Sequence, residues 1–246
     1  MTTSQEKELL KCTSLIRTED EDGNSEQATC FFIKRTVGNQ EHHYLVTCAH
    51  VLKDAFKIHI YLDYYHTETN TIEHAKKITL LPGDVVRFHP ECDLALLCID
   101  SIRNKNTSLD YYQYSPIDIS MIPSGYDSFS SFQSVLMLGY PSGFHDNTTN
   151  LPIVRTSITS TPLSSNYKGK KEFLINIPFL DGSSGSPILA LQDNAPYLVG
   201  MEYSKLVEKV ILDRKENRLY RSQKYTKEIE TGLGIAVRSD CILDLF

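Results

Sequence analysis

From Ala28 onward the chain is a succession of short runs rich in Val, Ile, Phe, Tyr and Thr, each bounded by turn-forming residues. These residue types favour extended backbone, and many closely spaced short strands are typical of a β-sandwich or a β-barrel. The runs therefore predict an all-β fold. In the first half of the chain the expected strands cover residues 28–35, 43–48, 57–63, 77–81, 85–88 and 94–99.

A polar, aromatic stretch that contains Pro116, Pro123 and Gly125 interrupts this rhythm. It is too long for a hairpin loop and has no sustained helical period, so it predicts a connector between two halves. In the second half the expected strands cover residues 134–139, 153–160, 173–177, 186–191, 197–203 and 233–237. Six strands in each half imply two six-stranded antiparallel β-barrels, and Ser239 stands where it would cap a short C-terminal helix.

The expected organisation has four parts. Residues 1–24 combine a short amphipathic piece with an acidic run, which predicts a docked or frayed N-terminal arm. The first barrel covers 25–105, the connector 106–132 and the second barrel 133–246. A charged insertion over 204–231 belongs to the second barrel.

The composition is that of an ordinary soluble globule. Hydrophobic residues make up 41% of the 246 positions, which excludes a low-complexity or globally disordered chain. The formal net charge of −6 argues against nucleic-acid binding, because that function needs a surplus of Lys and Arg. No apolar stretch approaches the roughly 18 to 20 residues of a membrane span, so no membrane partner is expected.

The six cysteines show neither CxxC pairs nor the density of a secreted disulfide scaffold. We expect reduced thiols that mostly pack as small apolar side chains. The N-terminus also lacks the apolar core of a signal peptide. Together these features predict a cytoplasmic location.

Three short motifs carry residue types used in nucleophilic catalysis. The segment VTCAHVL (46–52) presents His50 after a strand, ECDLALL (91–97) opens a strand with Asp93, and DGSSGSPI (181–188) is a tight loop around Ser184. Taken singly, each fits an ordinary role as a turn histidine, a turn cap or a loop.

Together the three motifs supply one residue of each kind that a serine nucleophile needs. Serine is a poor nucleophile until an adjacent imidazole accepts its proton, and the imidazole needs a carboxylate to fix its tautomer. His50 and Asp93 fall in the first half and Ser184 in the second. We therefore expect the site in the cleft between the barrels.

The segments TCAHVL, DLALL and GSSGSP resemble the three signature segments of trypsin-like (chymotrypsin-fold) serine peptidases, in that family's order. The stretch over 135–189 is similar to bacterial intracellular trypsin-like peptidase domains more than to secreted digestive enzymes. The resemblance covers residues 28–240 and implies a two-barrel fold with protein or peptide substrates.

The family pattern Gly-x-Ser-Gly-[Gly/Ser]-Pro places the nucleophile three residues before the proline, which with Pro187 selects Ser184. It also assigns the backbone N–H groups of Gly182 and Ser184 to the oxyanion hole. An α/β-hydrolase elbow needs glycine two residues after the nucleophile and a Ser, Asp, His order. Position 186 is Ser and the order here is reversed, so the elbow is excluded.

One departure from the family pattern concerns control. Ser183 stands where secreted members place an aspartate that pairs with a newly cleaved N-terminus. That ion pair cannot form in this chain. We therefore expect the site to be controlled by partner binding or by loop order.

The resemblance places the base of the specificity pocket near residues 178 and 179, and its walls near 201–205 and 233–235. No base residue is acidic, and a basic P1 side chain would bury a charge without a partner, so we expect an apolar or small neutral P1 residue. Glu202 is the exception, because a shift of one or two positions would bring its carboxylate into the pocket. The residues expected to bind substrate are Pro178, Phe179, Met201, Glu202, Tyr203, Ser204 and Gly234.

The insertion over 204–231 is locally positive within an acidic protein. It is either a solvated hairpin or helix, or a surface that binds a regulatory protein partner or gates substrate. RNA binding is a third reading, which the scarcity of interleaved aromatic residues disfavours. No metal or cofactor is expected, since the chain has neither a tight His/Cys ligand spacing nor a phosphate-cradling glycine loop.

The sequence thus predicts a serine endopeptidase in which Ser184 attacks, His50 transfers the proton and Asp93 orients His50. The alternative from another class is a catalytically silent chymotrypsin-fold module that binds proteins. An esterase without peptidase activity is a third possibility.

Overall fold

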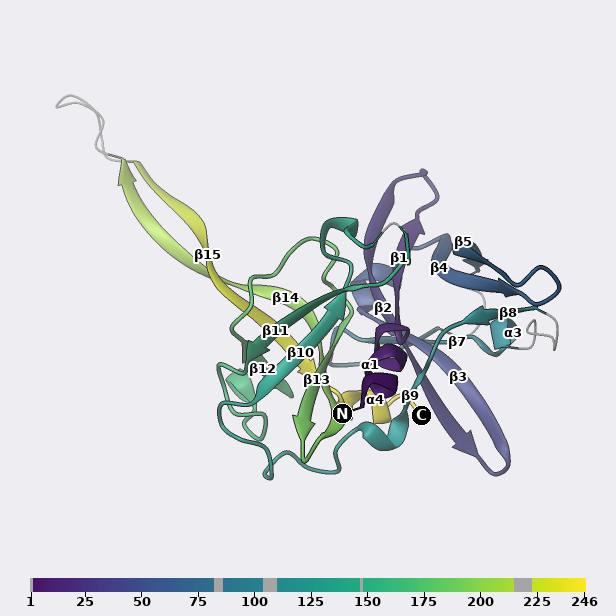
Figure 1. Cartoon of the computed structure of the whole chain (residues 1–246). Coiled ribbons are helices and arrows are strands. Elements are labelled where there is room, and N and C mark those ends of the chain that lie inside the picture. Colours follow the sequence, from purple (N-terminus) through teal and green to yellow (C-terminus); the bar gives the residue numbers. More distant parts are fainter. Residues whose placement is uncertain (1, 82–85, 104–109, 147, 215–222) are drawn as a thin grey trace.

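The computed structural model describes residues 2–81, 86–103, 110–146, 148–214 and 223–246, with the side chains of 212–225 left out. Two β-sheets make up most of this part of the chain, which confirms the all-β fold class (Figure 1). The helices are short, and each lies at a turn or near a chain end. They are α1 (Thr3–Leu10), α2 (Ala49–Leu52), α3 (Asp100–Arg103) and α4 (Asp240–Leu243), with 3₁₀ turns at Ile119–Met121, Pro141–Gly143 and Tyr167–Gly169.

The first sheet has nine strands among the described residues, three more than expected. Its order is β5-β4-β1-β2-β3-β7-β6, with β8 paired to β4 and β9 paired to β2. All neighbours are antiparallel except β9, which runs parallel to β2. The strands are β1 (Thr13–Glu19), β2 (Ser25–Val37), β3 (Gln40–Thr47), β4 (Lys57–His66), β5 (Thr71–Leu80), β6 (Val86–Phe88), β7 (Ala95–Cys98), β8 (Asp110–Gln113) and β9 (Ile117–Asp118).

Strand β1 comes from the segment expected to form a docked or frayed arm. It lies between β2 and β4, in a register that pairs Ile16 with Ala28 on one side and with Ile60 on the other. Leu15 and Ile16 are buried on opposite faces of the strand. The segment is therefore an inner strand of the first sheet.

The second sheet has six strands within the described residues, as expected, in the order β11-β10-β13-β14-β15-β12. Strand β10 covers the predicted residues 134–139, whereas β14 and β15 continue far into the charged insertion. The insertion is therefore a β-hairpin, which protrudes from the sheet as a two-stranded arm (Figure 1). The strands are β10 (Ser134–Gly139), β11 (Ile153–Ile158), β12 (Glu172–Ile175), β13 (Ser186–Gln192), β14 (Ala195–Arg214) and β15 (Gln223–Arg238).

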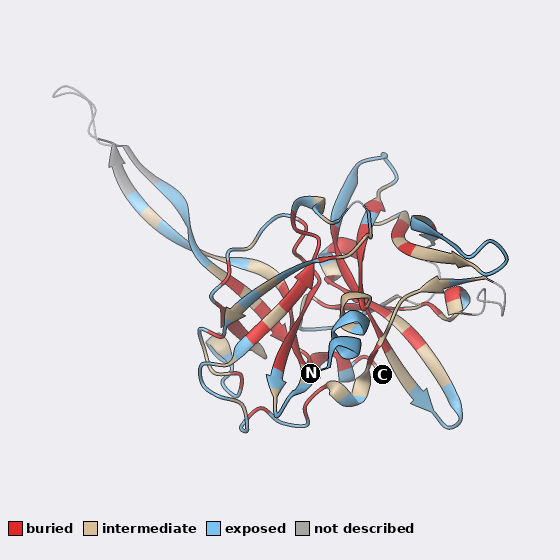
Figure 2. Cartoon of the chain, viewed as in Figure 1, coloured by how far each residue is buried: buried red, intermediate tan, exposed pale blue. Residues whose placement is uncertain are grey.

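The buried residues gather in the strands of both sheets, while the part of the protruding arm whose side chains are described is mostly exposed (Figure 2). The larger hydrophobic cluster includes Phe31 and Leu45 of the first sheet together with Leu189 and Leu198 of the second. A smaller cluster around Phe173 lies within the second sheet. One continuous core thus joins the sheets and fixes the cleft between them.

Helix α4 confirms the short C-terminal helix. Ser239 occupies its N-cap position, but its hydroxyl does not cap the helix. The Ser239 Oγ instead donates to the carbonyl of Leu198 over 2.6 Å and bonds to the Tyr126 hydroxyl. Ser239 therefore ties the helix to β14. No helix in the described ranges is long and apolar enough to cross a membrane.

Candidate active site

His50 lies in α2, the single helical turn that follows β3. The buried residues Val51 and Leu52 anchor this turn against the first sheet. The His50 side chain is 47% exposed, so it stays accessible from the cleft.

The Asp93 carboxylate holds His50 at two points. Its Oδ1 accepts the backbone N–H of His50 at 2.9 Å, and its Oδ2 lies 2.5 Å from the His50 Nδ1. This hydrogen bond raises the pKa of His50 above its ordinary 6.5, against the opposing effect of burial. Burial alone would raise the pKa of Asp93, but the bonds from His50 lower it below its ordinary 3.8. The arrangement places the proton on Nδ1 and leaves Nε2 as an acceptor.

Ser184 lies in the turn that leads into β13 and connects to both sheets. Its carbonyl accepts the N–H of Thr29 from β2 at 2.8 Å, and the next amide, Gly185 N–H, donates to Glu202 O of β14 at 2.8 Å. Gly185 has φ +88°, and a Cβ there would lie 1.9 Å from the Thr29 carbonyl oxygen. Only glycine fits at this contact between the sheets.

Gly182 holds the other side of the same turn. Its φ is +84°, and a Cβ there would lie 2.7 Å from the carbonyl oxygen of Tyr140. Its carbonyl accepts the hydroxyl of Thr29 at 2.9 Å. Within the described part of the chain, neither Gly182 N–H nor Ser184 N–H donates to a protein acceptor. Two amides are therefore free on the residues expected to form an oxyanion hole.

The Ser184 hydroxyl is not hydrogen-bonded to His50 Nε2 in this arrangement of the described residues. It lies near the buried Cys48 thiol, whose pKa is raised well above its ordinary value by burial and by Asp93, with Ser184 opposing. In unliganded catalytic sites the serine–histidine contact is often long and tightens on binding. A rotation of the serine side chain is therefore needed before proton transfer.

A cleft of about 590 Å³ holds His50, Asp93, Gly182 and Ser184 together. Of the residues expected to bind substrate, Phe179, Tyr203 and Ser204 line this cleft. Lys205, in the range 201–205 expected to form a wall of the pocket, also lines the cleft. The other lining residues were not expected there, because the topology brings them from β2 and from the turn before Gly182. They are Glu26, Gln27 and Asp181.

The remaining residues expected in the specificity pocket do not line the cleft. Pro178 is exposed, whereas Met201 and Glu202 have no exposed surface. Gly234 lies directly beside Glu202, since a Cβ on Gly234 would be 2.5 Å from the Glu202 Oε1. Burial raises the pKa of Glu202 to about 8, although the nearby Arg155 opposes the shift. The carboxyl group thus lies behind the wall of the cleft.

Arg155, on β11, is a residue that the sequence analysis did not single out. Its guanidinium donates to the Pro178 carbonyl and to the Ser183 hydroxyl, each at 2.8 Å, and lies 3.4 Å from the Glu202 Oε2. These partners are distant in the sequence. The available signal was a lone arginine within an otherwise uncharged strand, IVRTSI.

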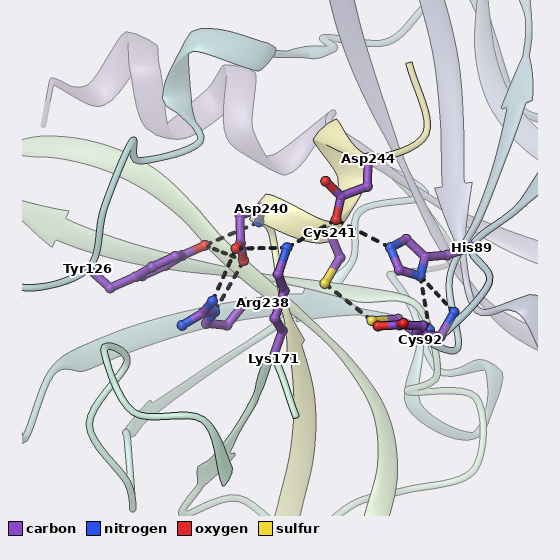
Figure 3. Close-up of polar contacts among 9 residues, drawn as sticks. His89, Cys92, Tyr126, Lys171, Arg238, Asp240, Cys241 and Asp244 are labelled. Atoms are coloured by element: carbon purple, nitrogen blue, oxygen red, sulfur yellow. Dashed lines mark hydrogen bonds and ion pairs between the residues drawn. The ribbon is translucent and has the colours of Figure 1, made fainter. Parts of the chain in front are cut away.

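Two groups of His, Cys and Asp side chains in the described residues lie close enough together to be compared with metal sites. In the first, His50 and Asp93 are committed to each other and the Cys48 thiol is buried. In the second, Nδ1 of His89 accepts the N–H groups of Glu91 and Cys92, and its Nε2 faces Asp244 (Figure 3). Neither group presents a free set of ligand atoms.

Comparison with known families adds a finding that is independent of this geometry. The family model described as a trypsin-like peptidase domain matches residues 28–201, more than half of the chain. The chain belongs to the trypsin-like peptidase domain family. No curated protein matches this trypsin-like domain.

Solved structures share the fold of this trypsin-like domain. An HtrA-type protease, AlgW in a variant form with a decapeptide, is 14% identical with a TM-score of 0.53. The alignment covers 95% of this chain and 62% of that protease, so the trypsin-like domain spans less than two thirds of it. A scabies mite inactivated protease paralogue is 13% identical with a TM-score of 0.54, covering 96% of this chain and 93% of its own. At these identities the similarity establishes the chymotrypsin fold alone.

Proposed function

We propose that the chain is a serine endopeptidase with Ser184 as nucleophile, His50 as general base and Asp93 as the group that orients His50. The observation that carries the proposal is the double contact of Asp93 with His50, inside a cleft that also holds Ser184 and two free backbone amides. Family membership supports proteins or peptides as the substrate class.

The reaction follows from these groups. Ser184 Oγ attacks the scissile carbonyl carbon while His50 Nε2 takes its proton, and Asp93 stabilises the imidazolium that forms. The developing oxyanion is held by the N–H groups of Gly182 and Ser184, each of which typically contributes about 3 kcal/mol to transition-state stability. His50 then gives its proton to the leaving amine. Water hydrolyses the acyl-enzyme by the same path in reverse.

An apolar or small neutral P1 residue fits the cleft best. Phe179 contributes aromatic surface to the cleft, and Glu202 lies buried behind the wall beside Arg155. The Glu202 carboxyl is therefore not available as a partner for a basic P1 side chain, and burying such a charge unpaired would be costly. Cleavage of a peptide library predominantly after Lys or Arg would contradict this preference.

We also propose that the β14–β15 arm binds a regulatory protein. The arm protrudes from the sheet (Figure 1), Lys205 at its base lines the cleft, and Ile211 and Ile229 are exposed on it by 68% and 44%. A photoreactive residue at position 211 should cross-link a specific protein in cells, whereas one at the exposed Phe132 should not. Identical cross-linking patterns at both positions would contradict a binding role for the arm. The basic residues 214, 215, 218, 221 and 224 have side chains outside the described residues.

The central test is active-site labelling. A fluorophosphonate probe should label Ser184, because the reagent reacts with a serine that an adjacent general base activates. Labelling should disappear in Ser184→Ala and in His50→Ala, and it should persist in Ser165→Ala, which alters an exposed serine away from the cleft. Labelling of a different serine would contradict the assignment of the nucleophile.

The catalytically silent binding module is the second candidate. It is favoured by the position of the Ser184 hydroxyl, which bonds to no acceptor on His50 in the described structure. A similar fold also occurs in the scabies mite protein described as an inactivated protease paralogue. An unlabelled wild-type protein that binds peptides with the same affinity as Ser184→Ala would establish this alternative. Turnover of esters but not peptides would indicate the esterase.

A further inference from the structure

Arg155 is a partly buried cation that contacts Ser183, the residue before the candidate nucleophile. Its side chain is 17% exposed, and burial lowers its pKa below the ordinary value. Removing a guanidinium from water is costly unless its N–H groups find acceptors. The acceptors that Arg155 finds therefore identify what holds it in place.

Two of these acceptors belong to one turn, residues 178–184, which we call the oxyanion turn. Arg155 Nη1 donates to the Pro178 carbonyl where the turn begins, and Nη2 donates to the Ser183 hydroxyl beside the nucleophile. Both distances are 2.8 Å, shorter than the 3.4 Å to the Glu202 Oε2. The two shortest hydrogen bonds of the guanidinium thus link Pro178 at the start of the oxyanion turn to Ser183 near its end.

Backbone contacts hold the rest of the oxyanion turn but leave its geometry sensitive at Ser183. Ser183 N–H donates to Leu180 O at 2.9 Å, and Asp181 O accepts the N–H of Ser142. Ser183 itself has no exposed surface, so its hydroxyl needs a buried partner, which Arg155 supplies. A rotation of the peptide unit between Ser183 and Ser184 would turn the free N–H group of Ser184 away from the cleft.

Glu202 does not account for the position of Arg155. Its Oε1 has no hydrogen-bond partner among the described residues, although the side chain is fully buried. An arginine placed to neutralise this carboxylate would form two parallel bonds with both oxygens. Arg155 instead directs Nη1 and Nη2 toward the turn and contacts Glu202 with one nitrogen only.

We propose that Arg155 is a positioning residue that holds the oxyanion turn open, with the Gly182 and Ser184 N–H groups directed into the cleft. It thereby replaces the ion pair that Ser183 cannot form with a cleaved N-terminus. This inference rests on the proposed peptidase function for its kinetic consequences. Its structural consequence, the order of the turn, does not depend on turnover.

The test compares Arg155→Met with Arg238→Met. Methionine keeps much of the length and apolar surface of arginine but has no donors. Arg238 is a matched control, because its side chain is 12% exposed, makes two 3.1 Å contacts with Asp240 (Figure 3) and does not line the cleft. The readouts are kcat and KM for a peptide, and amide hydrogen exchange of the segment 178–184.

In Arg155→Met we expect kcat to fall between about 10-fold and 100-fold, because the oxyanion donors are misplaced. KM should change by less than about threefold, since the cleft that binds substrate is retained. Exchange in 178–184 should accelerate by at least about tenfold. Arg238→Met should match the wild-type protein in all three. In Arg155→Ala, free guanidinium should restore part of kcat and slow the exchange again.

Wild-type kcat and exchange in a folded Arg155→Met would overturn the proposal. If that variant fails to fold, Ser183→Ala severs the same contact with a small change in volume, and unaltered exchange of 178–184 in it would overturn the proposal equally. A wild-type protein without turnover contradicts the proposed function. The exchange comparison still decides the role of Arg155 in that case.

Discussion

At the scale of single residues, Glu202 is the one described carboxyl group whose pKa is shifted upward. Burial raises it from its ordinary 4.5 to about 8, and Arg155 only partly offsets the effect. The charged group that faces it is the Arg155 guanidinium, and the nearby Cys48 thiol stays uncharged because burial raises its pKa. Between pH 4.5 and about pH 8, Glu202 keeps its proton in the folded chain but has released it in the unfolded chain. The stabilising effect of this proton is complete below pH 4.5 and is lost as the pH rises through about 8.

Glu202→Gln should remove this pH dependence, since a glutamine does not titrate. We expect the free energy of unfolding of the wild-type protein to fall between about pH 5 and pH 9 by at most about 5 kcal/mol from this group. The variant should show a flatter profile over the same range. Urea unfolding at several pH values measures the free energy of unfolding of the wild-type protein and of Glu202→Gln. Glu230→Gln serves as a control, because it alters an exposed acid. Parallel profiles for the wild-type protein and Glu202→Gln would show that the group titrates normally.

At the scale of elements, β1 is the strand on which the first sheet depends. Helix α1 precedes it and contributes no fully buried residue, whereas β1 hydrogen-bonds β2 and β4 and buries Leu15 and Ile16. Removing an inner strand leaves two rows of backbone groups without partners. The two elements therefore differ sharply in what their loss would cost.

A chain that starts at Lys11 should remain folded, with a loss of stability of about 1 to 2 kcal/mol from the contacts of Leu9 and Leu10 with the core. A chain that starts at Ser25 lacks β1 and should fail to fold. Circular dichroism and soluble yield distinguish the two forms. A cooperative unfolding transition in the shorter chain would show that β2 and β4 pair without β1.

The strands that the sequence predicted well are those whose composition alone identifies them. Strand β10 coincides with its predicted range, because an apolar run with a clear turn on each side leaves little choice. Strand β1 was missed because the acidic run from Glu19 to Asp22 resembles a solvated arm, and only the pairing with β2 and β4 makes the segment before this run a strand.

The three signature motifs indicated His50, Asp93 and Ser184. Arg155 was missed because its partners Ser183 and Glu202 come together only in the folded chain.

At the scale of the whole molecule, two free thiols that are distant in the sequence, Cys92 and Cys241, lie in contact. Cys92 precedes Asp93 in the first sheet's turn before β7, and Cys241 lies in α4 after the second sheet. Their Sγ atoms are 3.2 Å apart, and they are separated by 149 positions in the chain (Figure 3). The hydrogen bond from Cys241 lowers the pKa of the Cys92 thiol, while the same contact raises the pKa of Cys241. Cys92 is therefore the thiol that ionises first and reacts first with an oxidant.

Hydrogen peroxide should convert this pair to a disulfide. Cys92 is oxidised to a sulfenic acid with loss of water from the peroxide, and attack by the Cys241 sulfur then releases the second water. Peptide mapping should find one cross-link between the two, with the mass lowered by two hydrogen atoms. Because the bond closes a very long loop, oxidation should stabilise the fold by at most about 5 kcal/mol.

Cys92→Ser should abolish both the cross-link and the stabilisation. Cys98→Ser, which alters a half-buried thiol with no sulfur neighbour among the described residues, should leave them intact. An oxidised wild-type protein in which peptide mapping finds no Cys92–Cys241 cross-link would contradict the arrangement described here.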